Sequence, residues 1–464
     1  MPDSTPAATD RPLKPVLGPF SATCVVIGAI IGIGIFFTPQ SVATTTGSMS
    51  LAMLAWSLGG LIAMAGALTF AELGGMYPRT GAQYRILRDA WTSPTGFAYV
   101  FCNATYIQAG AIAIIGWYGA LNLGVAVRGS PPDEFTIILV SATMIAGLTL
   151  ANLLGVRFGS TIQNATVVAK LATLLLITAL AWWAPGTGGT GLSGETAEAL
   201  EGTRANSPFY LVFAGLIGVF FSFGGWQHAL WIGDEVHRPR RNLPLAIGVG
   251  MVIVTVVYLL VNWAYFLLLG FNGVVESDAL AAEAVAVVWP GFGERLVAAA
   301  IAVSAFGVLN AQLLSGPRLI YGMARDGKFF APFARVSPRT GTPLLAIAFL
   351  GGLGLAILLI ARDAERIDQL LTGVVTVDSV FFLLTGLALF RLRDPQNRAG
   401  TWRTPAFPLI PVIFVIGEAL VLTGALLINE THRNGALVGL AWIAAALLMY
   451  VVFFRKAPDA PPAD

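Results

Sequence analysis

Twelve apolar segments, each about long enough to cross a lipid bilayer as a helix, follow one another along the chain. Within a bilayer a segment of this length satisfies its own backbone hydrogen bonds by forming an α-helix. Only 11% of the residues are charged, against about 25% in ordinary soluble proteins. We therefore predict an all-α polytopic membrane protein with twelve transmembrane helices. The segments are roughly 19–43, 49–76, 96–127, 134–154, 158–183, 208–234, 243–269, 294–323, 342–360, 367–390, 407–427 and 436–454.

The first segment is interrupted near its centre by residues 28–36 (GAIIGIGIF), which include Gly28, Gly32 and Gly34. Each glycine weakens a helix by roughly 1 kcal/mol relative to alanine. Irregular backbone at membrane depth is tolerated only where it is buried in protein or borders a wet cavity. We interpret these residues as a helix break that offers amides and carbonyls to a ligand. The alternative is a small-residue face for close helix packing, for which Gly28 and Gly32 have the right spacing.

A second interruption favours the ligand interpretation. Residues 222–226 (SFGGW) break the sixth segment, five spans after the first break. Paired interruptions at corresponding positions of two halves indicate an inverted-repeat transporter with its site at the bilayer midplane. The predicted organisation is a tail over 1–18, a first repeat over 19–183, a second repeat over 207–390, two further helices over 407–454 and a tail over 455–464.

The distribution of positive charge predicts the orientation. Lys and Arg gather in the connections on the side of the N-terminus, for example at Arg238, Arg240 and Arg241, whereas the opposite connections hold few. By the positive-inside rule we predict that both termini are cytoplasmic, in the inner (plasma) membrane. Residues 1–18 have no apolar core or cleavage pattern, so we expect a tail and not a signal peptide. The net charge of +2 gives no reason to expect a nucleic-acid partner.

The two breaks supply complementary groups for one ligand. A half-helix that begins after residues 33–35 points free amides, with a positive dipole end of about half a charge, at a bound carboxylate. Carbonyls left open near Ile30 and over 221–224 suit an ammonium group. Such a site holds an α-amino acid without any charged side chain. Trp226 and Gln227 lie just past the second break and are candidates to shape the side-chain pocket.

Lys170 lies in the middle of the fifth segment, too deep to reach an interface easily. A charge at this depth costs at least roughly 2.5–3.5 kcal/mol on insertion scales, so an intramembrane lysine is a functional hypothesis. One alternative is a lysine that reaches the interface through its long stem. Another is a lysine that loads and releases a proton.

Other polar groups in apolar segments are harder to assign. Asp378 in the tenth segment and Glu418 in the eleventh have no evident partner, and Asp378 is either a packing hydrogen-bonder or a proton site. Arg318 is a candidate to pair with Glu72 or Glu235.

No cofactor, metal site or enzyme activity is predicted. His228 has no second ligand at helical spacing, so packing is favoured over metal binding. Cys24 and Cys102 both lie in apolar segments, which indicates neither a disulfide framework nor a metal site. Zinc-protease, Asp-rich diphosphate and nucleophile-elbow motifs are absent from the sequence, which argues against an intramembrane enzyme.

Five motifs in register resemble the amino acid–polyamine–organocation superfamily, and within it the L-type amino acid transporter branch. They are the first break, the turn FAELGGMYPRTGAQY at 70–84, the run from Phe221 to Ile247, ARDG at 324–327 before Thr342 and Pro343, and WRTP at 402–405. The resemblance covers about residues 17–454. It implies a LeuT-like 5+5 inverted repeat with broken helices 1 and 6, plus two extra C-terminal helices.

The resemblance also implies roles for single residues. Phe221 matches the family's gating aromatic, and Lys170 stands where sodium-coupled relatives hold a sodium ion, with its amine directed at the carbonyl of Gly28. We therefore predict independence from sodium. The family usually has serine where this chain has Ile33, which puts affinity or substrate preference in doubt. The implied ligands are the amides of Ile33, Gly34 and Ile35 for the carboxylate, and the carbonyls of Ile30, Phe221 and Gly224 for the amine.

The predicted function is sodium-independent transport of neutral L-amino acids by alternating access, as an exchanger or a proton-coupled symporter. Neutral substrates are favoured because neither break holds an acidic side chain. The alternative is a polyamine or amino-acid/amine antiporter on the same fold, and a channel is disfavoured because no pore ring is evident. Animal members of the family join a heavy chain through a cysteine between the third and fourth spans. Residues 127–134 contain none, so no disulfide-linked partner is expected.

Overall fold

The computed structural model describes residues 18–77, 82–154, 160–183, 207–227, 236–325, 327–337, 340, 342–393, 402–427 and 430–455, without the side chains of 160–167, 314 and 315. Within these ranges the regular structure is helical, as the apolar segments predict. The predicted tails over 1–18 and 455–464 lie outside the described residues except for residues 18 and 455. The turn at 78–81, His228 and Glu235 also lie outside them.

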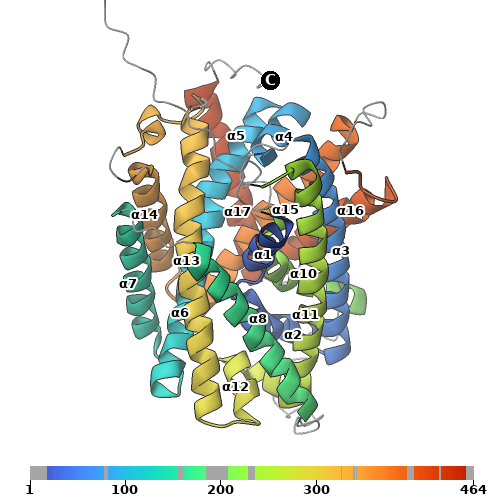
Figure 1. Ribbon diagram of the computed structural model, residues 1–464, viewed down its shortest axis with the longest axis vertical. Helices are drawn as coiled ribbons and strands as arrows, with labels where there is room; N and C mark the ends of the chain where they lie inside the picture. The colour runs from blue at the N-terminus through green and yellow to red at the C-terminus, as the bar shows by residue number, and fades with distance from the viewer. Residues whose placement is uncertain are drawn as a thin grey trace, which may run out of the picture.

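The helices follow the predicted segments in order and stand mostly along the long axis of the molecule (Figure 1). The short helix α12 lies at one end of the bundle, opposite the end at which α4 lies. The α-helices are α1 (Pro19–Ile30), α2 (Thr38–Thr46), α3 (Met49–Met76), α4 (Ala82–Ala90), α5 (Ser93–Cys102), α6 (Gln108–Arg128), α7 (Glu134–Leu153), α8 (Ser160–Trp183), α10 (Pro208–Phe223), α11 (Pro239–Glu276), α12 (Leu280–Ala286), α13 (Phe292–Arg325), α14 (Leu344–Ile360), α15 (Ala364–Leu392), α16 (Leu409–Leu427) and α17 (Glu430–Met449). Short 3-10 helices are η1 (Gly34–Phe36) and η5 (Ala331–Ala334), and π-helical turns are η2 (Asn103–Ile107) and η6 (Tyr450–Phe454).

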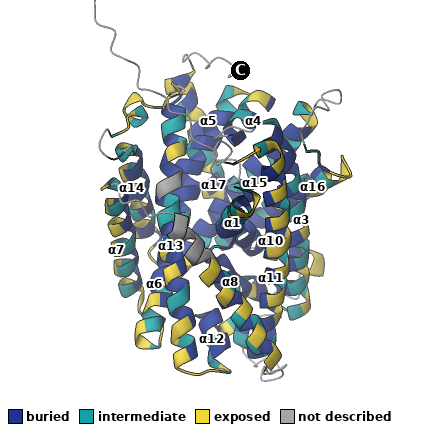
Figure 2. Cartoon of the chain, in the orientation of Figure 1, coloured by how far each residue is buried: buried dark blue, intermediate teal, exposed yellow. Residues whose placement is uncertain are grey.

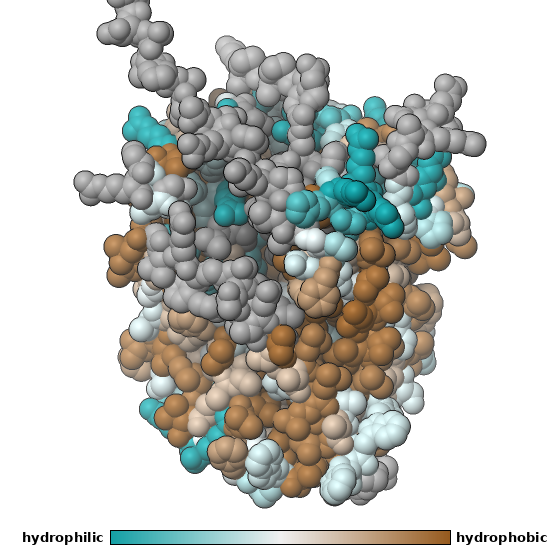
Figure 3. Space-filling view, viewed as in Figure 1, coloured by the Kyte–Doolittle hydropathy of each residue, from teal (hydrophilic) through white to brown (hydrophobic). Residues whose placement is uncertain are grey.

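Eight helices of the described chain are long and apolar enough to cross a membrane: α3, α5 to α6, α7, α11, α13, α15, α16, and α17 with η6. Shorter apolar helices accompany them, namely α1, α10, α14 and the part of α8 from Val168 to Trp183. Figure 3 shows hydrophobic side chains across the middle of one face and hydrophilic ones gathered mainly at its upper end. The protein is therefore a multi-pass membrane protein. Two of the short helices, α1 and α10, lie in the segments for which the sequence predicts breaks.

The hydrophobic core runs through the middle of the bundle and includes the buried residues of α1. Residues near the centre are buried on most sides, whereas outer helices such as α7 expose one face (Figure 2). Within this core, Phe70 of α3 meets Phe382 of α15 and Phe414 of α16 edge to face. Gly66 of α3 has no side chain, which leaves room for the Phe414 ring against the helix backbone. These aromatic contacts join α3, α15 and α16 into one packed block.

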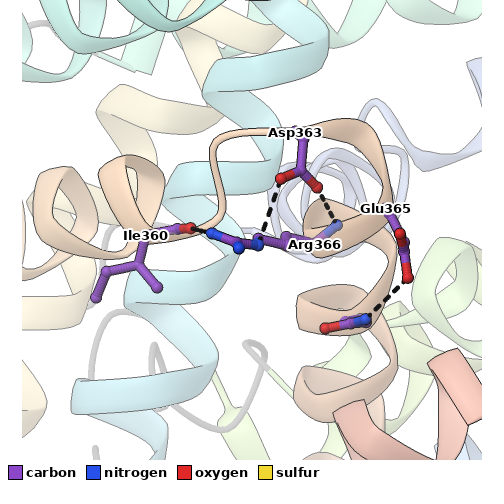
Figure 4. A network of polar contacts seen from close by, with 5 residues as sticks. Ile360, Asp363, Glu365 and Arg366 are labelled. Carbon is purple, nitrogen blue, oxygen red and sulfur yellow. Dashed lines mark hydrogen bonds and ion pairs between the residues drawn. The ribbon is translucent and has the colours of Figure 1, made fainter.

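Polar contacts fix the first turn of α15 (Figure 4). Asp363 caps the helix by accepting a hydrogen bond from the Arg366 amide at 2.9 Å. The Arg366 side chain lies 3.3 Å from the Asp363 carboxylate and donates to the Ile360 carbonyl at 3.1 Å. The turn between α14 and α15 is thereby held at one end of the bundle.

The opposite end of α15 is joined to α3 through Glu72. Arg393 pairs with this buried carboxylate at 3.0 Å, and the Thr404 amide donates to it at 2.7 Å. The predicted pair of Glu72 with Arg318 is therefore wrong, because Arg393 lies just past the end of α15 and takes that position. The other predicted partner, Glu235, lies outside the described residues.

Candidate functional site

The chain leaves the path of α1 after Ile30. The Gly32 amide turns back to donate to the Ile30 carbonyl at 2.7 Å, and the single 3-10 turn η1 follows before α2 begins. Within the described part of the chain, the amides of residues 33–35 donate no hydrogen bond. Consecutive free amides at the start of a half-helix are the arrangement that binds anions in proteins.

The second break begins where α10 ends, at Phe223. Gly224 is extended (φ −56°, ψ 148°), and Gly225 has a φ of +124°, which residues with a Cβ rarely adopt. The Gln227 side chain holds this turn by accepting a hydrogen bond from the Gly225 amide at 2.9 Å. As far as the described residues go, the carbonyls of Phe221 and Gly224 accept no hydrogen bond. This break therefore offers acceptors where the first break offers donors.

The two breaks lie against each other. A Cβ on Gly225 would lie 2.4 Å from the carbonyl oxygen of Ala29, so the second break passes directly over the end of α1. A Cβ on Gly34 would lie 2.8 Å from Ser222 Oγ, so the first break in turn passes close to the end of α10. Thr38 and Ser222 share a hydroxyl hydrogen bond of 2.6 Å across the same boundary. Glycine at both positions is what permits this contact.

Both breaks keep some accessible surface. Gly32 at the first break, and Phe221 and Gly224 at the second, are only partly buried. The Phe221 ring lies 5.8 Å from that of Phe37, which stacks on Tyr118 of α6 at 3.7 Å between centroids. All three rings are half-buried. Phe221 thus belongs to a row of three aromatic side chains beside the breaks. Of the three, only Phe221 was predicted from the sequence.

Trp226 is fully buried behind the second break. Its ring lies 5.1 Å from Phe382 and 6.4 Å from Phe70 between centroids. In this conformation Trp226 anchors the chain after Gly225 in the aromatic core, while Gln227 fixes the turn through its hydrogen bond. Both residues support the break from within the protein.

Tyr258 of α11 joins the two breaks, although sequence analysis did not single it out. Its hydroxyl lies 3.2 Å from the Ile30 carbonyl and 3.0 Å from the Ser222 carbonyl, and the residue is 0% exposed. The Ile30 carbonyl thus has two neighbours, the Tyr258 hydroxyl and the Gly32 amide. No sequence signal marks this role, because one tyrosine in a long apolar helix has the pattern of a core residue.

Removing the Tyr258 hydroxyl is expected to loosen the contact between the breaks. In Tyr258→Phe two carbonyls lose this donor, a change that costs about 1–3 kcal/mol when such groups stay buried. We expect a lower melting temperature of the purified protein. Tyr265→Phe is the matched control, because Tyr265 is equally buried further along α11 and its hydroxyl has no partner among the described residues. Equal melting temperatures of the two variants would contradict the bridging role.

Lys170 connects α8 to the first break. Its side chain is 3% exposed, and Nζ donates to the Ile31 carbonyl at 3.0 Å. The predicted partner, the Gly28 carbonyl, is wrong: α1 continues to Ile30, so Ile31 carries the first carbonyl beyond the helix. The lysine stays inside the protein and does not reach an interface. Its position next to the carboxyl end of α1 is favourable for a cation, because that end of the helix dipole is negative.

Comparison with known proteins places the chain in one family. Residues 17–454 match the family described as amino acid permease. The chain is 29% identical to the serine/threonine exchanger SteT of Bacillus subtilis (strain 168) over 442 residues, which is 93% of this chain and 96% of that protein. It is 30% identical to the b(0,+)-type amino acid transporter 1 of Homo sapiens over 461 residues, which is 95% of this chain and 88% of that protein. It is 29% identical to the Asc-type amino acid transporter 1 of Homo sapiens over 481 residues, which is 98% of this chain and 86% of that protein. The chain therefore belongs to the amino acid permease family of the amino acid–polyamine–organocation superfamily, whose members are transporters and not enzymes.

Proposed function

We propose that the protein is a sodium-independent transporter of neutral L-amino acids that works by alternating access, with its substrate held between the two helix breaks. The observation that carries this proposal is the contact between a break with free amides and a break with free carbonyls. The amides of Ile33, Gly34 and Ile35 would bind the carboxylate. The carbonyls of Phe221 and Gly224, with that of Ile30 beside them, would bind the amine.

The architecture that we propose for this function is the LeuT-like 5+5 inverted repeat. Residues 19–183 would form the first repeat, 207–390 the second, and 407–454 the two additional helices. The eight long and four short apolar helices of the described chain support this count, since the broken first and sixth spans account for two of the short ones. We place the protein in the plasma membrane with both termini in the cytoplasm, on the distribution of Lys and Arg.

The polar side chains at the breaks support neutral substrates. Those bonded to the breaks within the described chain are Thr38, Ser222, Gln227, Tyr258 and Lys170. None is acidic, so a cationic substrate would lack a counter-ion. The fixed positive charge of Lys170 opposes binding of a sodium ion beside the first break. The name of the serine/threonine exchanger SteT points to small neutral amino acids as the first substrates to try.

We expect the protein to act without a disulfide-linked heavy chain. Cys24 lies in α1 and Cys102 lies in α5, whereas the connection between α6 and α7 has no cysteine.

Uptake into proteoliposomes tests the proposal. Labelled serine, alanine and leucine are offered, with and without sodium, to vesicles that are empty, loaded with the same unlabelled amino acid, or placed under a pH gradient. We expect saturable uptake that does not depend on sodium. Stimulation only by internal amino acid would establish exchange, and accumulation driven by the pH gradient would establish proton coupling. Putrescine uptake without amino acid uptake would replace the proposal with the polyamine alternative.

A further inference from the structure

Two acidic side chains lie in the middle of neighbouring helices, Asp378 in α15 and Glu418 in α16. The helices run antiparallel, because Phe390 near the end of α15 contacts Phe407 just before α16, with ring centroids 5.4 Å apart. Nearer the middle of both helices, Phe382 contacts Phe414, with ring centroids 6.4 Å apart. Asp378 precedes Phe382 by one turn and Glu418 follows Phe414 by one turn, so this register brings the two carboxyl groups together. They are close enough for two negative charges to repel.

Neither carboxyl group has a hydrogen-bond or ionic partner among the described residues. Glu418 is 0% exposed, and both of its oxygens lack a hydrogen bond, as does the enclosed Oδ1 of Asp378. The Ser379 hydroxyl lies near the Glu418 carboxyl group but does not complete a hydrogen bond in this conformation. An ionised, unpaired carboxylate in such a place is very costly, so in this conformation at least one of the two groups carries a proton.

The titratable groups of the packed helices do not neutralise this pair. On α3, Glu72 is bonded to Arg393 at one end of α15. On α17, His432 lies 3.9 Å from Asp368, near the other end of α15. On α10, the Tyr210 hydroxyl donates to a backbone carbonyl at the end of α16. The pair thus lies between these polar contacts, among apolar and aromatic side chains.

We propose that Asp378 and Glu418 form a proton-binding site that is loaded and emptied during transport. On loading, a carboxylate oxygen takes up the proton and becomes a hydroxyl group that donates to the second carboxylate. On release, the proton leaves through Asp378, which keeps part of its surface accessible. A proton is favoured over a metal ion because hard cations require six or more oxygen ligands, and this site offers two carboxyl groups and one hydroxyl. The proposal rests on the transport function proposed above.

The aromatic core connects this pair to the second break. Phe414 lies one turn from Glu418 and contacts Phe382, whose ring is 5.1 Å from that of Trp226. Trp226 follows Gly225 directly. A change of charge at the pair therefore acts on helices that hold the chain at the break, which gives proton loading a physical route to the substrate site.

Infrared spectroscopy of the purified protein tests the site without reliance on transport. At neutral pH the wild type should show the C=O stretching band of a protonated, buried carboxyl group. The band should be lost in the double variant Asp378→Asn, Glu418→Gln, and addition of serine should change it in the wild type. Thr423→Ala, on the exposed side of α16, is the control and should retain the band. Gel filtration and circular dichroism verify that each variant is folded.

Transport measurements complete the test. Glu418→Gln mimics a permanently protonated site, so amino acid accumulation driven by a pH gradient should be lost in this variant and retained in Thr423→Ala. Absence of the band in the wild type, or its persistence in the double variant, would overturn the proposal. A band that serine does not change, together with normal pH-driven accumulation in Glu418→Gln, would also overturn it. A wild type that shows the band and carries no amino acid would instead refute the proposed transport function.

Discussion

Gly225→Ala is expected to abolish most transport activity. The added Cβ would lie 2.4 Å from the carbonyl oxygen of Ala29 and 3.0 Å from the Ile30 amide nitrogen, both of which are backbone atoms that cannot rotate away. The φ of +124° adds strain, which costs of order 1–3 kcal/mol for residues with a Cβ. The breaks would be pushed apart, and the donors and acceptors for the substrate would no longer face one ligand. We expect initial uptake rates in proteoliposomes to fall by about tenfold or more.

The neighbouring glycine provides a matched control. Gly224 has an extended backbone, and a Cβ there would make ordinary contacts of 3.5 and 3.6 Å. Gly224→Ala should therefore retain much of the transport rate, since its backbone carbonyl is unchanged. If both substitutions reduced uptake equally while the proteins remained folded, the close approach of Gly225 to α1 would not be what transport requires.

Lys170→Ala is expected to slow or uncouple transport in a protein that still folds. The substitution removes the ammonium group that donates to the Ile31 carbonyl at 3.0 Å, and a buried hydrogen bond from a charged group contributes about 1.5–3 kcal/mol. The end of α1 would lose its attachment to α8, so we expect uptake to fall by about tenfold or more. Uptake of labelled serine, with and without a pH gradient, measures the effect.

Thr173→Val is the control for Lys170. Thr173 lies one turn further along α8, is also buried, and donates its hydroxyl to the Ala169 carbonyl of its own helix. Its hydroxyl bonds to its own helix and not to either break, so transport should be near normal. Wild-type flux in Lys170→Ala would contradict the role assigned to the lysine. If only pH-driven accumulation were lost and exchange persisted, Lys170 would itself carry the proton, as its alternative assignment holds.

An all-helical membrane protein and the positions of its two breaks could be predicted from the sequence because their signals are local. The length of an apolar segment and the spacing of Gly28, Gly32 and Gly34 are properties of a short stretch, and so is the SFGGW interruption. The cost of a charge in a bilayer likewise marks Lys170 without knowledge of its neighbours. The partner of Lys170 is the carbonyl of Ile31, three residues after the predicted Gly28. The difference arises because the end of α1 depends on packing, which the spacing of the glycines does not indicate.

Contacts between residues that are distant in the chain could not be predicted from the sequence. Tyr258 bridges residues that are 228 and 36 positions away along the chain, and nothing in its own segment separates it from a core tyrosine. Asp378 and Glu418 were each conspicuous in an apolar segment, but only the register of α15 against α16 shows that they lie at the same level of neighbouring helices. The pairing of Glu72 with Arg393 could not be predicted either, because it depends on where α15 ends.

The central claim is that free amides and free carbonyls together hold the carboxylate and the amine of one amino acid. The measurement that tests it most directly is competition for labelled serine uptake by serine, by ethanolamine, which lacks the carboxylate, and by 3-hydroxypropanoate, which lacks the amine. The arrangement of the two breaks predicts that only serine competes, because each analogue leaves one set of backbone groups unpaired. Competition by ethanolamine as strong as that by serine would contradict the claim and favour an amine carrier.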